Sequence, residues 1–158
     1  MDNKNTSFKI TINFLNDKKI IIRNGELYIN IDEEDDWLLI NSNSIMAYDN
    51  TIIKIKDLDE NKEFYLFLIN TNLIVSDNVV TINTFNKENI YKKATKRINN
   101  KEEIKDLVNK INYYNSLQKI GLSLDQYIEK NSLNQKLYIE TLKQNLQLIG
   151  DRNYEDKK

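Results

Sequence analysis

The sequence predicts an all-β sandwich of about 80 residues followed by an α-helical hairpin, because a run of strands precedes a run of helices. Apolar and polar residues alternate along segments such as Phe8–Phe14, which is typical of strands with one buried face. Turn-forming residues separate these segments at short intervals. After Thr84 the apolar residues recur at steps of three and four, which indicates amphipathic helices.

Strands joined by tight turns are expected throughout the first half. They are predicted at residues 8–14, 18–23, 27–31, 37–40, 45–48, 51–55, 64–69, 73–75 and 79–82. Asn24–Gly25 is the strongest hairpin signal, because both residues accept positive φ. The last three segments are predicted to form a meander with turns at Asn70–Asn72 and Ser76–Asn78, and this meander is the expected core.

Helices are expected in the second half. Asn86 is predicted to cap a short helix that continues through Ile98, and a longer helix is predicted to begin at Asn100 and to end at Gly121. Capping boxes at Ser123 and Ser132 predict either two further helices or one kinked helix. The two apolar stripes consist of Ile104, Leu107, Val108, Ile111, Tyr114 and Leu117, and of Leu133, Leu137, Leu142, Leu146 and Ile149.

These patterns divide the chain into a β-sandwich domain at 1–84, a helical domain at 85–150 and a disordered polar tail at 151–158. The two helical stripes are expected to bury themselves mainly against each other. The hairpin should therefore detach at a cost of about a few kcal/mol, as low-stability units do. A chain truncated after Thr84 is expected to keep a folded β domain.

Composition excludes several classes of function. The chain of 158 residues has a net charge of −1 and contains neither Cys nor His, so thiolate chemistry and the commonest general base and metal ligand are missing. We expect no catalytic residues, no cofactor, no metal and no nucleic-acid partner. The polar amino terminus is unlike a signal peptide, and no apolar run approaches the roughly 20 residues that span a bilayer. A cytoplasmic protein without membrane insertion is expected.

Three charged or aromatic clusters are candidate sites. The acidic run Asp32–Asp36 lacks the glycine and ligand spacing of a calcium loop and is expected to be a solvated loop. Tyr113–Tyr114 is more often helix packing than a stacking platform. A basic cluster, more often a source of solubility than a phosphate site, consists of Lys92, Lys93, Lys96, Arg97 and Lys101. Partner binding is the remaining class.

Three segments carry a resemblance to a known family. Val75–Ile82, Val-Ser-Asp-Asn-Val-Val-Thr-Ile, matches the pattern Val-x-x-Asn-x-Val-Thr-Ile, Phe8–Ile12 matches an opening strand, and Thr51–Ile55 matches a Gly-Val-Leu-Arg-Ile strand with Thr in place of Gly. Together with the order of β domain and helical hairpin, over residues 8–149, they resemble the ε subunit of rotary ATP synthases.

This resemblance implies a non-catalytic rotor subunit of an F-type-like ATPase. Its partners would be the γ shaft, the α and β subunits and a membrane c-ring or a substitute base partner. It would lie in the cytoplasm, peripheral to the inner face of the cell membrane. The family's ATP motif, Ile-Asp-x-x-Arg-Ala, falls on Ile90–Thr95, where the Asp and the Arg are missing, so no nucleotide binding is expected.

The family's loop Gly-x-Phe-Gly-Val-Leu-Pro-Asn-His falls on residues 35–43, where only its aromatic and apolar positions persist. Ordinary coupling to a c-ring is therefore not implied. Asp36, Trp37 and Asn43 are the candidate interface residues at this end, with Trp37 as a core residue of the sandwich the alternative. A pleckstrin-homology-like β module with a helical dimerisation tail remains the alternative fold and function, and a single capping helix would favour it. An enzyme is the third possibility.

Overall fold

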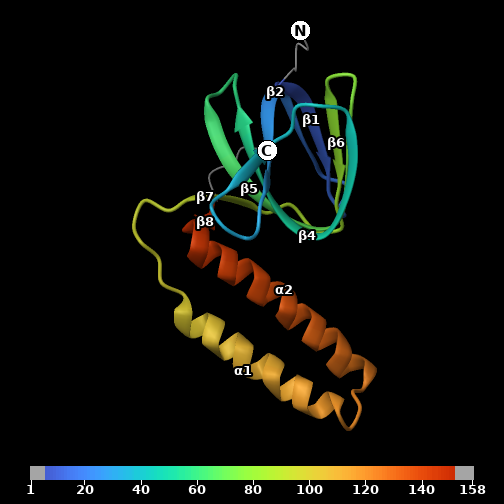
Figure 1. Cartoon of the computed structure of the whole chain (residues 1–158), viewed down its shortest axis with the longest axis vertical. Coiled ribbons are helices and arrows are strands. Elements are labelled where there is room, and N and C mark those ends of the chain that lie inside the picture. Colours follow the sequence, from blue (N-terminus) through green and yellow to red (C-terminus); the bar gives the residue numbers. More distant parts are fainter. Residues whose placement is uncertain (1–5, 152–158) are drawn as a thin grey trace. The chain divides into compact units, whose positions relative to one another are not determined.

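The structure of the protein, a computed structural model, describes residues 6–151 (Figure 1). The chain forms two compact units. Among the described residues, the first comprises 6–92 and 150–151, and the second comprises Lys93–Ile149.

The structure contains eight strands and two helices among the described residues. The strands are β1 (Phe8–Asn13), β2 (Lys19–Asn30), β3 (Trp37–Leu39), β4 (Ser44–Asp57), β5 (Lys62–Ser76), β6 (Val79–Asn83), β7 (Ile90–Lys93) and β8 (Leu148–Gly150). The helices are α1 (Lys101–Gln118) and α2 (Leu124–Leu146). None of the helices in residues 6–151 is long and apolar enough to cross a membrane.

Five strands close into a barrel, not a sandwich. Antiparallel pairing joins β1 to β2, β2 to β4, β4 to β5 and β5 to β6, and a parallel pair of β6 with β1 closes the ring. The prediction of a sandwich is therefore wrong, whereas the prediction of a β region followed by a helical hairpin is confirmed. The long strands β2, β4 and β5 contribute to both sides of the barrel, which makes one closed sheet out of the two layers expected.

Several predicted turns lie inside continuous strands. Asn24–Gly25 does not form a hairpin, because β2 runs through it, and the strands predicted at 45–48 and 51–55 are both part of β4. The expected three-stranded meander consists of two strands. Asn70 has a positive φ, but the chain does not reverse there, and β5 continues through it. Only Asp77–Asn78, with φ of 52° and 65°, reverses the chain between β5 and β6, as two residues of positive φ do in a tight hairpin.

Gly25 is needed for close approach of the backbone rather than for a turn. The pairing of β1 with β2 shifts register between Phe8 and Ile10, so β2 is irregular beside Gly25. A Cβ atom on Gly25 would lie 2.8 Å from a methyl carbon of Ile22, 3.1 Å from Ile10 and 3.2 Å from the carbonyl oxygen of Lys56. Alanine therefore does not fit without displacement of the barrel wall.

We predict that Gly25→Ala lowers the free energy of unfolding by about 1–3 kcal/mol, the usual cost of overpacking. Urea unfolding followed by circular dichroism measures it. Gly150→Ala is the matched control, because a Cβ atom there has nothing within 4 Å. An equal and small effect of the two substitutions would contradict the close packing at Gly25.

The barrel core continues past Thr84. Ile90 of β7 is fully buried within the same cluster as Ile10, Ile82 and Leu66, and it pairs with Leu66 of β5. The predicted short helix at residues 86–98 is absent, because the segment is extended and contains β7.

Asn86 belongs to the barrel instead of capping a helix. Its side-chain amide donates to the carbonyl of Phe67 at 2.8 Å, and its oxygen accepts from the backbone N–H of Ile69 at 3.2 Å. Thr84 is buried and its hydroxyl lies 2.8 Å from that of Thr71. These bonds satisfy polar groups at the end of the barrel, as buried polar groups require.

The second unit contains the two predicted helices as an antiparallel hairpin. Ser123 and Gln126 form the predicted capping box, with the Ser123 hydroxyl accepting from the Gln126 N–H at 3.2 Å. The second box, at Ser132, is not used, because α2 is one helix that runs through it and ends at Leu146. Ile111, Leu133, Leu142 and Leu146 are the buried apolar residues of the two helices, so much of the predicted stripes stays partly exposed.

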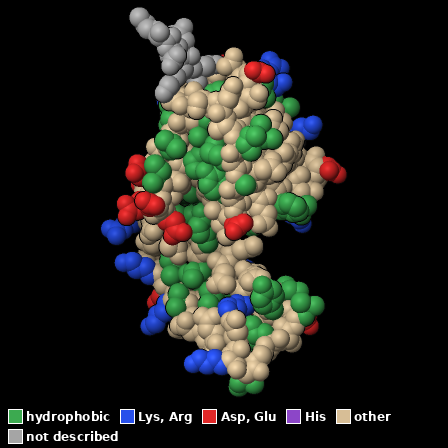
Figure 2. All heavy atoms as spheres, turned by 45° about the vertical axis from the view of Figure 1, so that its right-hand side comes forward, with side chains coloured by type: hydrophobic (Ala, Val, Ile, Leu, Met, Phe, Trp, Pro, Cys, Tyr) green, Lys and Arg blue, Asp and Glu red, His purple; other side chains and the backbone are tan. Residues whose placement is uncertain are grey.

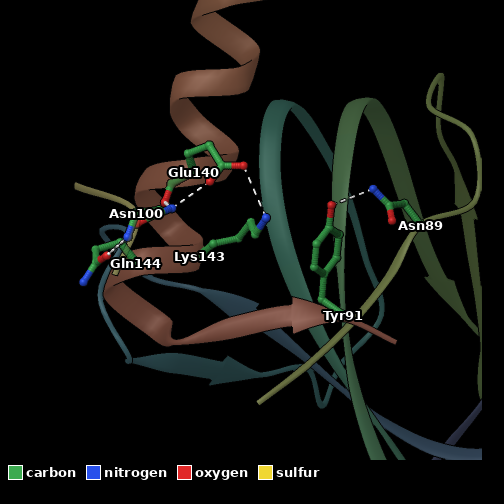
Figure 3. A network of polar contacts seen from close by, with 6 residues as sticks. All are labelled: Asn89, Tyr91, Asn100, Glu140, Lys143 and Gln144. Carbon is green, nitrogen blue, oxygen red and sulfur yellow. Dashed lines mark hydrogen bonds and ion pairs between the residues drawn. The ribbon is translucent and has the colours of Figure 1, made fainter. Parts of the chain in front are cut away.

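Polar contacts within the second unit hold the start of α1 to the last turns of α2 (Figure 3). The Asn100 side chain donates to the backbone and side-chain oxygens of Glu140 at 2.8 and 2.7 Å, and its N–H donates to Gln144 at 2.9 Å. Lys143 pairs with Glu140 at 3.2 Å.

In the first unit, Asp151 pairs with Lys92 at 3.9 Å. The remainder of the predicted tail lies outside the described residues.

Candidate protein-interaction surface

Large apolar side chains gather on the outside of the barrel. In the described part of the first unit, all the exposed large apolar residues except Leu38 lie at outward positions on or beside β1, β2, β4, β5 and β6. We call this surface the isoleucine face. It consists of Leu15, Ile21, Ile45, Ile74, Val79 and Phe85, with Thr11, Thr81, Asn13, Asn72 and Asn83 between them.

Strand register sets the central row of the isoleucine face. Ile21 pairs with Thr11, Thr11 with Thr81, Thr81 with Ile74, and Ile74 with Ile45. Directly paired residues project on the same side of a sheet, so these side chains form one line from β2 to β4. Ile21 is 54% exposed and Ile45 is 80% exposed. The row therefore offers aliphatic side chains that no part of the barrel covers.

An asparagine ladder lies beside this row. Asn83 of β6 pairs with Asn13 of β1 and with Asn72 of β5. The Asn13 amide donates to Asn83 at 2.9 Å, and the Asn83 amide donates to Asn72 at 3.0 Å. The side chains are thus linked to one another along the surface, which supplies polar groups without charge.

Leu15 and Phe85 extend the face beyond the asparagine ladder. The parallel pairing of β1 and β6 continues past the strand ends, where Thr84 donates to the carbonyl of Asn13 and Leu15 donates to that of Asn86. Leu15 and Phe85 follow in the same register and are 59% and 64% exposed. At the other end Val79 pairs with Lys9.

Strand geometry gives the size of this surface. Four intervals of about 4.8 Å lead from Ile21 in the first half of β2, through β1, β6 and β5, to Ile45 in the first half of β4. Three steps of about 6.7 Å separate Val79 from Phe85, so the face covers roughly 400 Å² along the barrel. Figure 2, which turns the side bearing β4 and β6 toward the viewer, shows hydrophobic and uncharged side chains over much of the barrel. A patch of this size on a soluble protein is often an interaction site.

The sequence-predicted residues Asp36, Trp37 and Asn43 lie elsewhere. Trp37 begins β3 and packs on the outside of the barrel, with its ring centroid 5.5 Å from that of Tyr65 and its indole N–H donating to Asp35 at 2.8 Å. It is partly exposed, so it is not a core residue. Asp36 and Asn43 are exposed, one before and one after β3, and no contact joins them within residues 6–151.

Trp37 belongs to an aromatic row on a second outward surface. Tyr28, Lys54 and Tyr65 are paired in register across β2, β4 and β5. The Lys54 ammonium lies 4.5 Å from the Tyr28 ring centre and 5.0 Å from that of Trp37, within the range of cation–π attraction. The aromatic rings and the Lys54 ammonium contact one another, which favours a structural role for Trp37.

Burial raises the pKa of Tyr65, and a hydrogen bond to Glu63 raises it further. An unfolded tyrosine loses its proton near pH 10, whereas folded Tyr65 keeps it to higher pH. We predict that this stabilising contribution is complete below about pH 10 and is lost as the pH rises above it. Unfolding measured from pH 8 to 11 should show a shallower alkaline loss for Tyr65→Phe, and Tyr127→Phe, an exposed helical position, should leave the profile unchanged.

Comparison with known proteins gives the family. The family model described as the UU051 N-terminal domain matches residues 9–89, and that described as the uncharacterised protein UU051 C-terminal domain matches residues 101–151. The "Uncharacterized protein UU051" of Ureaplasma parvum serovar 3 is 36% identical over 151 residues, which cover 92% of this chain and 89% of the relative. The chain belongs to the UU051 family.

The basic cluster of this UU051-family chain does not form one site. Lys92 pairs with Asp151, and Lys93 donates to the carbonyl of Leu146 at 2.8 Å. Lys96 and Arg97 line an open polar depression of about 470 Å³ in the second unit. A second groove there, of about 410 Å³, lies between α1 and α2 and carries both acids and lysines. Among the described residues no group of three or more Asp or Glu is placed to hold a metal.

Sequence patterns contained a signal for the isoleucine face of this UU051-family protein. Ile20–Ile22 and Leu73–Val75 are uninterrupted apolar triplets within strands. Since alternate residues of a strand point to opposite faces, the central residue of each triplet must point away from the core. Those central residues are Ile21 and Ile74. An apolar residue that breaks the alternation in this way is therefore the sequence signal for an outward apolar surface.

Proposed function

We propose that this UU051-family protein is a non-catalytic subunit of a larger assembly and docks on another subunit through the isoleucine face. The observation that carries the proposal is the row of exposed isoleucines on Ile21, Ile74 and Ile45. Covering apolar surface contributes about 25 cal/mol per Å², so the apolar side chains within this face of roughly 400 Å² are a source of binding free energy. The amide ladder can satisfy polar groups of the partner without burying charge.

The assembly we propose is a rotary F-type-like ATPase, with this subunit at the position of ε on the γ shaft and near α and β. The segment that resembles the ε subunit, Val75–Ile82, is the β5–β6 hairpin and contributes Val79 and Thr81 to the isoleucine face. The order of barrel and helical hairpin supports the same proposal. Such a subunit would couple or regulate rotation in the cytoplasm at the inner face of the cell membrane.

The pleckstrin-homology-like module is the second proposal. One capping helix would favour it, whereas the second unit contains α1 of 18 residues and α2 of 23 residues in antiparallel arrangement. Two long helices that pack on each other favour an ε-like subunit. The number and length of the helices therefore weigh in favour of the rotary assembly.

Affinity purification of the tagged full-length protein from native cells tests the proposal. Mass spectrometry should recover ATPase α-, β- and γ-type subunits in stoichiometric amount with the bait. Recovery of a defined partner without any ATPase subunit would overturn the rotary assignment and keep the docking face. Recovery of the bait alone from gently lysed cells would contradict both.

A further inference from the structure

The isoleucine face has a basic edge. Lys9, Lys19 and Arg23 are exposed and alternate with buried residues along β1 and β2, so they project on the same side as Ile21. Lys19 pairs with Asn13 of the amide ladder, and Lys9 pairs with Val79. The edge therefore borders the face along β1 and the first half of β2.

Charge is segregated along the chain. Residues 6–25 contain four cations and one acid, Asp17, although the whole chain carries a net charge of −1. Within residues 6–151, Lys9, Lys19 and Arg23 form no ion pair. Arg23 also lies in the irregular part of β2 opposite Lys9, where the register shifts. Like charges across a strand pair destabilise a sheet, so the placement of Arg23 opposite Lys9 does not stabilise the barrel.

A partner on the isoleucine face covers this edge as well. A standard interface takes about 800 Å² from each protein, and the isoleucine face with its threonines and asparagines supplies roughly half of that area. The remaining footprint must extend beyond the rows. The outward positions of β1 and β6, and of β2 as far as Arg23, contain no carboxylate, so the cations there are available to carboxylates of a partner.

We propose that the docking partner is a protein surface with an aliphatic strip bordered by carboxylates, and that these carboxylates pair with Lys9, Lys19 and Arg23. This inference rests on the proposed docking function and adds the chemistry of the partner. Apolar contact provides the affinity, and the ion pairs fix the orientation of the partner and accelerate its association, as charges at an interface rim do. The binding is consequently sensitive to salt.

Charge reversal in the full-length protein tests the proposal. Lys19→Glu/Arg23→Glu should reduce co-purification of the partner by about tenfold or more, the effect of losing ion pairs at a rim together with new repulsion. Lys19→Arg/Arg23→Lys should retain the partner. Lys105→Glu/Lys119→Glu is the matched control, because it makes the same change in net charge on exposed positions of the helical hairpin. Binding of the wild type should weaken between 0.1 and 0.5 M KCl.

Each outcome decides one proposal. If charge reversal leaves recovery unchanged while Ile74→Arg abolishes it, the acidic partner edge is wrong and the docking face stands. If recovery depends on the edge but the partner is no ATPase subunit, the rotary assignment fails and this inference stands. If size-exclusion chromatography shows a homodimer that Ile74→Arg dissociates, the occupant is a second copy and the proposal is overturned.

Discussion

Replacing Ile74 by arginine is expected to release the protein from its assembly without unfolding it. Ile74 lies in the middle of the central row, between Thr81 and Ile45, and is 39% exposed in the free protein. A hot-spot residue near the centre of an interface contributes about 2 kcal/mol or more, and an unpaired charge buried there costs about 3–5 kcal/mol. The partner's affinity should fall by at least about 100-fold.

Leu38→Arg is the matched control for this substitution. Leu38 is an exposed apolar residue of the same unit, at 55%, but it belongs to β3 and lies outside the isoleucine face. Both variants should keep the unfolding transition of the wild type within about 0.5 kcal/mol, since surface substitutions rarely cost more. Equal loss of the partner in both variants would show that the isoleucine face is not the docking surface.

Replacing Ile90 by alanine is expected to destabilise the barrel by about 2–5 kcal/mol, the range for buried Ile or Leu to Ala. Ile90 is fully buried in the barrel core and pairs with Leu66, although it follows the change of periodicity at Thr84. This loss is a large part of the 5–15 kcal/mol by which a domain is stable. Chemical denaturation of the full-length chain measures it.

Ile45→Ala is the control for Ile90→Ala, because it makes the same change at a side chain that is 80% exposed. It should leave stability nearly unchanged and weaken partner binding, whereas Ile90→Ala should lower the stability of the barrel.

The first unit extends to Lys92, so a chain truncated after Thr84 lacks Ile90 and Asn86 and should fold poorly. A small effect of Ile90→Ala would show that β7 is dispensable for the barrel.

The strands and helices could largely be predicted from the sequence, because burial on one face leaves a period of two or of 3.6 residues. Closure of the barrel could not be predicted, because the parallel pairing of β1 with β6 joins residues about 70 positions apart. Such a pairing leaves no pattern within any short segment of the sequence. Turn residues were also misleading. Gly25 allows neighbouring strands to pack closely and does not form a turn. Asn70 has a positive φ, yet β5 continues through it.

The candidate site was predicted less well than the fold. Trp37, the one tryptophan, was predicted at an interface or in the core, but its ring packs beside Tyr65 and Lys54 on the outside of the barrel. The isoleucine face is assembled from five strands by register, and no short segment contains it. Outward apolar residues such as Ile21 become informative only when the pairing of the strands is known.

Photo-cross-linking from position 74 in native cells tests the central claim most directly. A photoreactive amino acid at position 74 of the full-length protein reports which protein covers the isoleucine face, and the same amino acid at position 38 reports on the barrel surface outside it. We predict a cross-link from position 74, and not from position 38, to the γ-type shaft subunit of a rotary ATPase. Cross-links from position 74 to unrelated proteins only, or to none, would contradict this account.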